Sequence, residues 1–393
     1  MKSNNNVAST NRTLHIVDSV DLVDSNNWNF ILPSQNIYLS IPYLKAIEDG
    51  LTKAEFRYVI FLDNNSDVIG IAYFQLLWIT KNEINSHALV NKFGRAFPKS
   101  IIEQLKSRIL ICGNAFATGE NGFYFSSTIG TSEKIELLNQ AFERVVKAEK
   151  QKQKPISIAL IKEFWSTSNI YNTFSKVSFH ELMIDVNMVV DLDSRWRTFD
   201  DYLFSLNSKF RTKAKQVFNK SDKLEIVDFD CESILERIND INELYHGMVD
   251  KANFSFGRLN ANTFLLLKKT LKDSFYFKAY LLNNQLIGFA TATHFDNILD
   301  GNFIGINHRF VKDYALYQRI LYDFIDFGIK CKSKVIRLGR TAEEIKSGVG
   351  ALPKNMTFYA KHQSKFFNLI LTPFLKKVKP SEYNIRQPFK KKN

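Results

Sequence analysis

The second half of the chain carries several side chains that could take a proton from a nucleophile. They are carboxylates and histidines at expected strand ends or on a late helix: Asp296, Asp300, Glu343, Glu344, His294 and His308. Such groups act as general bases when they reach the reacting proton. A carboxylate at a strand end can equally be a turn residue, and this alternative is strongest for Asp296. Neither histidine is spaced with a cysteine as a nucleophile pair, so the sequence does not support a covalent mechanism.

Lysines are the other candidates. Lys346, near an anionic centre, could stabilise a developing negative charge, and burial could lower its pKa enough for proton transfer. The alternative is an exposed helical lysine paired with Glu343, three residues earlier. A second basic group shares one expected helix: Lys209, Arg211, Lys213 and Lys215. These side chains could bind a nucleic-acid backbone or a phosphorylated acceptor, or could simply be the solvated face of the helix.

Composition limits the classes of partner. The net charge of +13, from 53 Lys and Arg against 40 Asp and Glu, favours a nucleotide cofactor, an RNA or an acidic membrane surface, although solubility alone would also explain it. Three widely separated cysteines (Cys112, Cys231, Cys331) give neither a metal-ligand spacing nor a disulfide framework, so we expect no metal and a cytoplasmic location. No stretch reaches the roughly 18 apolar residues that span a membrane. The polar start does not resemble a signal peptide.

The elements that must position these residues occur twice. Residues 56–79 and 275–295 each read as an apolar run, an Asn-rich turn and a second apolar run, which is typical of a β-hairpin. Each hairpin is followed by an amphipathic helix and a short strand, at 156–161 and 335–338. The two helical stripes are Ile135, Leu138, Phe142 and Val145, and Leu316, Ile320, Phe324 and Phe327. The chain length also favours two domains, so we predict a duplicated α/β unit with a boundary near residues 185–194.

The second unit opens with an expected helix over residues 199–220. Its buried stripe is Leu203, Leu206, Phe210, Ala214 and Val217.

Several short motifs accompany this order of elements. In the second half they are Ser208-Lys209-Phe210-Arg211, Phe256-Gly257-Arg258-Leu259, Asp300-Gly301-Asn302-Phe303-Ile304-Gly305, Tyr314-Ala315-Leu316-Tyr317 and Leu338-Gly339-Arg340-Thr341-Ala342-Glu343. In the first half they are Cys112-Gly113-Asn114 and Thr118-Gly119-Glu120. Over about residues 14–362 the chain resembles acyltransferases of the GNAT superfamily, in particular its Fem-type and cellulose-biosynthesis-type branch.

The resemblance implies an α/β protein with two tandem GNAT-like folds, each a mixed, largely antiparallel sheet flanked by helices. Residues 1–13 would be a flexible tail, and 14–190 an N-terminal domain with a structural or acceptor-binding role. Residues 191–365 would be the catalytic domain, and 366–393 an apolar and then basic extension. That extension would suit the surface of a membrane, or a C-terminal helix packed on the core.

The resemblance also implies a donor site for acyl-CoA, such as acetyl-CoA. In GNAT enzymes the strand before the central helix splays from its neighbour and binds the pantetheine arm. The donor-binding residues would then be Asn302, Ile304, Gly305 and Asn307 on this strand, with Arg309, Lys312 and Tyr314 in the following turn. The two glycines of the usual phosphate-binding turn are missing. Lys312 could replace their contacts as a point charge, whereas Tyr314 narrows the approach.

The late helix of many GNAT enzymes ends in Tyr-x-x-x-Gly-Phe, and its tyrosine protonates the departing thiolate. By resemblance Lys346 stands at the tyrosine position and Ala351 at the phenylalanine position. We therefore expect Lys346, Asp300 and Glu343 to be the catalytic residues.

The expected function is transfer of an acyl group from acyl-CoA, by direct attack of an amine of a small molecule or cell-envelope precursor. Two alternatives remain. One is a Fem-type transferase that uses aminoacyl-tRNA for cell-wall-type acceptors, a class that also lacks the glycine-rich turn. The other is a non-catalytic, degenerate GNAT binding protein.

Overall fold

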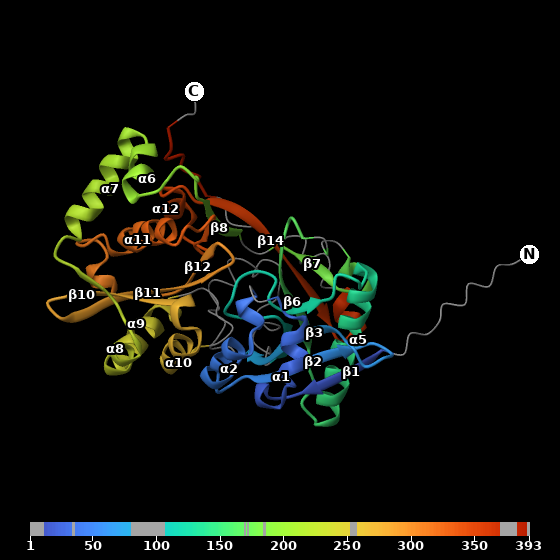
Figure 1. Cartoon of the computed structure of the whole chain (residues 1–393). Helices are drawn as coiled ribbons and strands as arrows, with labels where there is room; N and C mark the ends of the chain where they lie inside the picture. The colour runs from blue at the N-terminus through green and yellow to red at the C-terminus, as the bar shows by residue number, and fades with distance from the viewer. Residues whose placement is uncertain are drawn as a thin grey trace, which may run out of the picture.

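The computed structural model describes residues 12–33, 36–79, 107–168, 170, 173–183, 186–251, 258–369 and 383–390. Its strands form one sheet that continues through both halves, in the order β1-β2-β3-β4-β6-β14-β8-β13-β12-β11-β10-β9. β5 pairs with β3, and β7 pairs with β14. Helices lie against this twisted sheet in both halves (Figure 1).

The N-terminal half contains the first predicted hairpin and helix. Its strands are β1 (Thr13–Val17), β2 (Glu55–Leu62), β3 (Val68–Ile79), β4 (Ser107–Cys112), β5 (Phe123–Phe125), β6 (Ile158–Trp165) and β7 (His180–Leu182). Its α-helices are α1 (Ser25–Ile31), α2 (Ile41–Gly50) and α5 (Thr131–Gln151). The predicted stripe of α5 is buried against the sheet. A short 3₁₀ helix, Ile37–Leu39, carries Tyr38 into the core.

The C-terminal half repeats this order. Its strands are β9 (Glu225–Asp228), β10 (Phe275–Leu282), β11 (Gln285–Phe295), β12 (Ile298–Ile306) and β13 (Val335–Arg337). Its helices are α6 (Phe199–Ser205), α7 (Ser208–Lys220), α8 (Cys231–Glu236), α9 (Ile238–Val249), α10 (Asn262–Leu271), α11 (Leu316–Lys330) and α12 (Glu343–Ser347).

The predicted single helix over residues 199–220 is wrong, because the chain breaks between α6 and α7. Leu206 is extended and forms a β-bridge with Phe389, and the side chain of Asn207 accepts from the Phe210 N-H to cap α7. An asparagine side chain that satisfies a free N-H favours a new helix start over continuation.

Two strands link the halves. β8 (Val186–Asp191), which lies within the predicted boundary region 185–194, pairs with β13 of the C-terminal half. β14 (Leu352–His362), near the end of the C-terminal half in sequence, pairs with β6 of the N-terminal half. β8 and β14 also pair with each other through Val186 to Val189. Figure 1 shows β14 as a long strand running from one half into the other.

The helices on one side of the sheet share a core. Residues of α1 and α2 and residues of α8, α9 and α10 belong to one buried apolar cluster. Gly50 at the end of α2 lies so close to Thr263 of α10 that a Cβ at Gly50 would meet that side chain. The two halves are therefore joined by packing as well as by the sheet.

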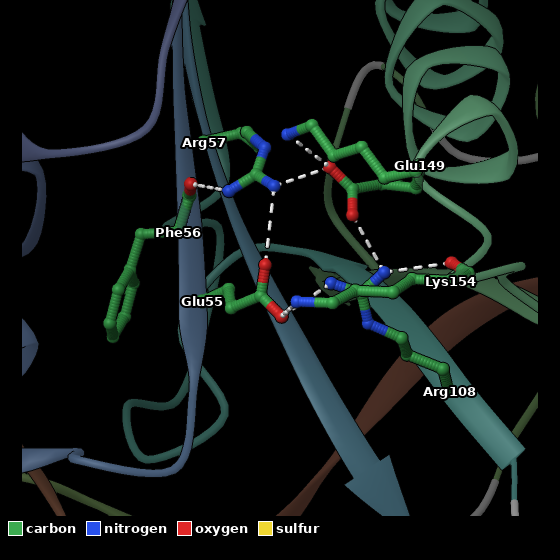
Figure 2. Close-up of polar contacts among 7 residues, drawn as sticks. Glu55, Phe56, Arg57, Arg108, Glu149 and Lys154 are labelled. Atoms are coloured by element: carbon green, nitrogen blue, oxygen red, sulfur yellow. Dashed lines mark hydrogen bonds and ion pairs between the residues drawn. The ribbon is translucent and has the colours of Figure 1, made fainter.

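Charged side chains also stabilise the N-terminal half from within. Glu149 of α5 is fully buried and forms ion pairs with Arg57 of β2 and Arg108 of β4 (Figure 2). Glu55 pairs with Arg108 at 2.7 Å and lies 3.4 Å from Lys154. Burial raises the pKa of Glu149, but hydrogen bonds from the two arginines outweigh it and bring the pKa to about 2.

The C-terminal extension is described only in part. Phe366, Phe367 and Leu369 are exposed, and residues 370–382 lie outside the described ranges. Residues 383–390 pack on the C-terminal half, where the Asn207 N-H donates to the Pro388 carbonyl at 2.8 Å. No helix in the described part of the chain is long and apolar enough to cross a membrane.

Candidate active site between the two halves

A bulge in β12 opens the edge of the sheet beside β13. β12 pairs with β13 only from Ile298 to Asp300, and from there to Ile306 it has no strand partner on that side among the described residues. The pairing with β11 shifts here, and Thr291 stands opposite the extra residue. The Phe303 N-H donates to the Thr291 hydroxyl at 3.0 Å, in place of a strand neighbour. A bulge bends its strand, so β12 turns away from β13.

Asp300 lies at the point where the two strands part. Its side chain is buried, and the Tyr38 hydroxyl donates to its Oδ2 at 2.7 Å. Asn302 donates to the Tyr38 oxygen at 3.0 Å and accepts from Thr293 at 2.6 Å. Arg337 lies 3.9 Å from Oδ2. Burial raises the pKa of Asp300 to about 6, against the lowering effects of Arg337 and the Tyr38 hydrogen bond.

Arg337 is positioned by the other half. Its guanidinium stacks on Trp165 of β6, with 4.7 Å from Cζ to the ring centroid. A stacked guanidinium has few alternative positions, so it stays near Asp300.

The N-terminal half supplies a second wall. After β4, residues 113–118 wrap around the Lys162 ammonium, which donates to the carbonyls of Asn114, Ala115 and Ala117 at 2.8 to 2.9 Å. Burial and the nearby Arg340 hold the pKa of Lys162 well below its usual value. Glu163 forms ion pairs with Lys162 and with Arg340 of the C-terminal half.

The third wall is a strained turn after β13. Gly339, Thr341 and Ala342 all have positive φ, at 72°, 62° and 54°. Such angles are costly for residues that carry a Cβ and persist only where the surroundings enforce them. Lys346 provides that restraint, since its ammonium donates to the carbonyls of Gly339 at 3.2 Å and Arg340 at 2.5 Å.

These walls enclose a polar cleft of about 190 Å³. Its lining residues come from both halves: Ala115, Phe116, Ala117, Thr118, Lys162, Asp300, Gly301, Asn302, Gly339 and Arg340. A buried carboxyl of raised pKa among amide and cationic groups can accept a proton from a bound amine. Among the described residues, no group of three or more His, Cys, Asp or Glu side chains could hold a metal ion.

The structure separates the three predicted catalytic residues. Asp300 lines the cleft. Lys346 lies behind the wall that Gly339 and Arg340 form, and it is only 3% exposed. The interpretation of Lys346 as an exposed lysine is therefore wrong. Burial lowers its pKa to about 7, partly offset by Glu343. Glu343 is half-buried in the first turn of α12 and is not among the residues lining the cleft.

The predicted donor-binding residues lie along the open edge and beyond it. Asn302, Ile304 and Gly305 belong to the free stretch of β12, and Asn307 follows it. Arg309 and Lys312 are exposed and Tyr314 half-buried in the turn before α11. α11 begins after Ala315, which has a positive φ of 48°, and no side chain caps its first N-H groups.

Other base candidates lie elsewhere. Asp296 and Asn297, both with positive φ, form the turn between β11 and β12. Glu344 lies on the far side of α12, where it pairs with Arg386.

Sequence reasoning missed Tyr38, Lys162 and Arg340 as site residues. Tyr38 is 262 positions from Asp300, and no local pattern connects them. Lys162 lies just beyond the strand predicted at 156–161, and β6 continues through it to Trp165. A lysine in the middle of an apolar strand was the available signal, because an unpaired charge is rarely buried there.

No protein-family model matches the chain, and no curated protein matches its sequence significantly. Solved structures do match. A tandem GNAT protein from the clavulanic acid biosynthesis pathway, solved without acetyl-CoA, matches with a TM-score of 0.52 at 8% identity, over 90% of this chain and 99% of that one. The chain has a tandem GNAT fold. The predicted fold class is thereby confirmed.

Two further solved structures match with lower TM-scores. FemX matches with a TM-score of 0.47 at 9% identity, over 81% of this chain and 90% of its own. L-PGS from Bacillus licheniformis matches with a TM-score of 0.47 at 7% identity, over 85% of this chain and 91% of its own.

Proposed function

We propose that this tandem GNAT protein is an N-acyltransferase that moves an acyl group from acyl-CoA to an amine acceptor bound between its halves. The observation that carries the proposal is Asp300, a buried carboxyl with a pKa of about 6 at the parting of β12 and β13. A base with a pKa near the working pH is well suited to deprotonate an amine.

The reaction follows from this placement. The pantetheine arm would lie along the free edge of β12, where the backbone groups of Ile304 and Ile306 alternate with those bonded to β11 and face the open side. The amine nitrogen attacks the thioester carbonyl, so a C-N bond forms and the C-S bond breaks. Asp300 takes the proton that the nitrogen loses, and the thiolate leaves to become the CoA thiol by gaining a proton. Amide and thiol are the net products.

Neighbouring groups set up this step. Tyr38 and Asn302 orient the Asp300 carboxyl, and Lys346 acts as a positioning residue for the Gly339–Arg340 wall. Lys346 bonds the two carbonyls most strongly as an ammonium, since charge-assisted hydrogen bonds are the stronger ones. Arg309 and Lys312 would meet the donor diphosphate near the uncapped start of α11.

The test measures turnover of acetyl-CoA and longer acyl-CoAs with a panel of amines. Turnover is monitored through the CoA thiol that the reaction releases. We expect kcat/KM to rise as pH increases through about 6, where Asp300 loses its proton, and to fall above about 7, where Lys346 loses its charge. Asp300→Asn should lower kcat/KM about 10² to 10⁴-fold. It should also remove the rise of kcat/KM through about pH 6, which is the acid limb of the profile.

Asp296→Asn is the matched control, because it changes a turn carboxylate on the same hairpin. Equal losses in the two variants would contradict the role of Asp300. If the parent transfers no acyl group from any CoA thioester but does so from aminoacyl-tRNA, the donor assignment is wrong. If it uses neither donor, the protein is a binding protein.

A further inference from the structure

A groove on the outer face of the C-terminal half lies apart from the cleft. It measures about 760 Å³ and is lined by Lys209, Phe210, Thr212, Lys213, Gln216, Glu344 and Arg386. α7 forms one side, and α12 and the segment 383–390 form the other.

The groove carries uncompensated positive charge. Its three cations, Lys209, Lys213 and Arg386, face one carboxylate, Glu344, which Arg386 already binds at 2.6 Å. The pKa of Lys213 is lowered by burial first and then by Arg386, so the site is one where an added anion would be favourable.

The groove is also held in shape. The Arg386 N-H donates to the Ser347 hydroxyl at 3.0 Å, which fixes the segment to the end of α12. On the other side of Arg386, the Lys390 N-H donates to the Ser205 carbonyl at 3.0 Å, and the Phe389 ring lies against Gly350. Arg386 is thus anchored from both directions.

α7 connects this groove to the expected diphosphate site. Lys209, Lys213, Gln216 and Lys220 follow one another at helical spacing on one face of α7. At the end of that row, the Lys220 ammonium donates to the Lys312 carbonyl at 3.3 Å, in the turn before α11. A rise of 1.5 Å per residue puts Lys213 roughly 10 Å along the helix from Lys220.

Acyl-CoA carries phosphate at two places, a 5′-diphosphate next to the pantetheine arm and a separate 3′-phosphate on the ribose. We propose that the α7 groove binds the 3′-phosphate of the donor through Lys213 and Arg386. The inference rests on the proposed function, because the donor must first lie along β12 with its diphosphate near Lys312. Arg386 presents several donors to a phosphate, and Lys213 adds a point charge.

The experiment compares binding of CoA and of dephospho-CoA, which lacks only the 3′-phosphate, by titration calorimetry. The parent should bind CoA at least about tenfold more tightly than dephospho-CoA, as expected for one charge-assisted contact. Lys213→Gln combined with Arg386→Gln should abolish this difference and leave the affinity for dephospho-CoA unchanged. Lys215→Gln, on an exposed position of α7 outside the groove, is the matched control and should keep the difference.

Equal affinities of the parent for the two ligands, or an undiminished difference in the double variant, would overturn the assignment. So would loss of tRNA binding in that variant with CoA binding intact, because the groove would then belong to RNA. Turnover separates this inference from the proposed function. If the parent acylates amines but does not distinguish CoA from dephospho-CoA, only the assignment of the groove is wrong. If it binds CoA but transfers no acyl group, the proposed function is wrong.

Discussion

Tyr38 adjusts the acidity of Asp300 from the opposite half of the molecule. Its hydroxyl donates to the carboxylate and so stabilises the charged form, while burial favours the neutral form. Because burial dominates, the pKa settles at about 6, above the ordinary value of 3.8. Folding therefore favours the protonated acid, and the stability that this provides is lost as pH rises from the ordinary value through 6.

Tyr38→Phe should raise the pKa of Asp300 further, because the carboxylate loses a hydrogen bond. The acid limb of kcat/KM should move up by about 1 pH unit, which corresponds to about 1.4 kcal/mol. The measurement is the pH profile of the variant beside that of Tyr43→Phe. The Tyr43 hydroxyl accepts from Asn114, whereas the hydroxyl that donates to the carboxylate is that of Tyr38, so the Tyr43 variant should keep the parent limb. An unmoved limb in Tyr38→Phe would show that Asp300 is not the group that titrates.

The sequence pointed to Asp300 because its Asp-Gly motif belongs to the resemblance. It could not identify Tyr38, Lys162 or Arg340 as its neighbours. Their roles depend on the approach of two halves far apart in sequence, and residue type alone does not encode such contacts. Lys346 shows the intermediate case. The sequence pointed to this position, but whether its ammonium faces solvent, substrate or backbone is decided by the strained turn at Gly339.

At the scale of elements, buried ion pairs contribute to the packing of α5 on β2 and β4. Glu149 is buried between two arginines, and removing its charge leaves both of them to share the partly exposed Glu55. The pKa of about 2 means that the carboxylate favours folding at pH values above its ordinary 4.5. That contribution is lost as pH falls from 4.5 through 2.

Glu149→Gln should lower the free energy of unfolding by about 3 to 5 kcal/mol at neutral pH, because Arg57 and Arg108 would keep their charges in the core. Denaturant titration followed by circular dichroism measures the loss. Glu136→Gln, an exposed position on the same helix, should change stability by no more than about 0.5 kcal/mol. Similar effects of the two changes would mean that the buried ion pairs do not stabilise this packing.

Local patterns predicted the elements that local interactions form. The two hairpins and the stripes of α5 and α11 follow from alternation and helical spacing, and the structure contains them. The break between α6 and α7 escaped notice because the apolar stripe continues across it. What ends α6 is a β-bridge from Leu206 to Phe389, a contact across most of the C-terminal half.

At the scale of the whole molecule, the halves share a sheet and a core. β14 gives the N-terminal sheet a strand from the end of the second half, and β8 gives the C-terminal sheet a strand from the end of the first. No sequence pattern distinguishes a strand that stays in its own half from one that crosses. Two independently stable domains are therefore not expected, although the elements repeat.

Unfolding should be a single cooperative transition. Three of the four tryptophans, Trp28, Trp78 and Trp165, belong to the N-terminal half, so fluorescence follows mainly that half and circular dichroism follows both. The two signals should have the same midpoint in urea. Separate midpoints would show that the shared strands do not couple the halves. Fragments 1–190 and 191–393, prepared separately, should remain poorly folded and should recover structure only when mixed.

The crossing of β14 has a consequence for biosynthesis. A growing polypeptide usually folds its first domain while the second is still being made. Here β6 lacks this neighbour until residues 352–362 have left the ribosome, so the N-terminal half keeps an apolar strand edge unpaired while residues 166–351 are made. Such an edge invites pairing with other chains. We therefore expect a nascent chain stalled before residue 352 to be bound by chaperones and to become protease-resistant only after β14 emerges.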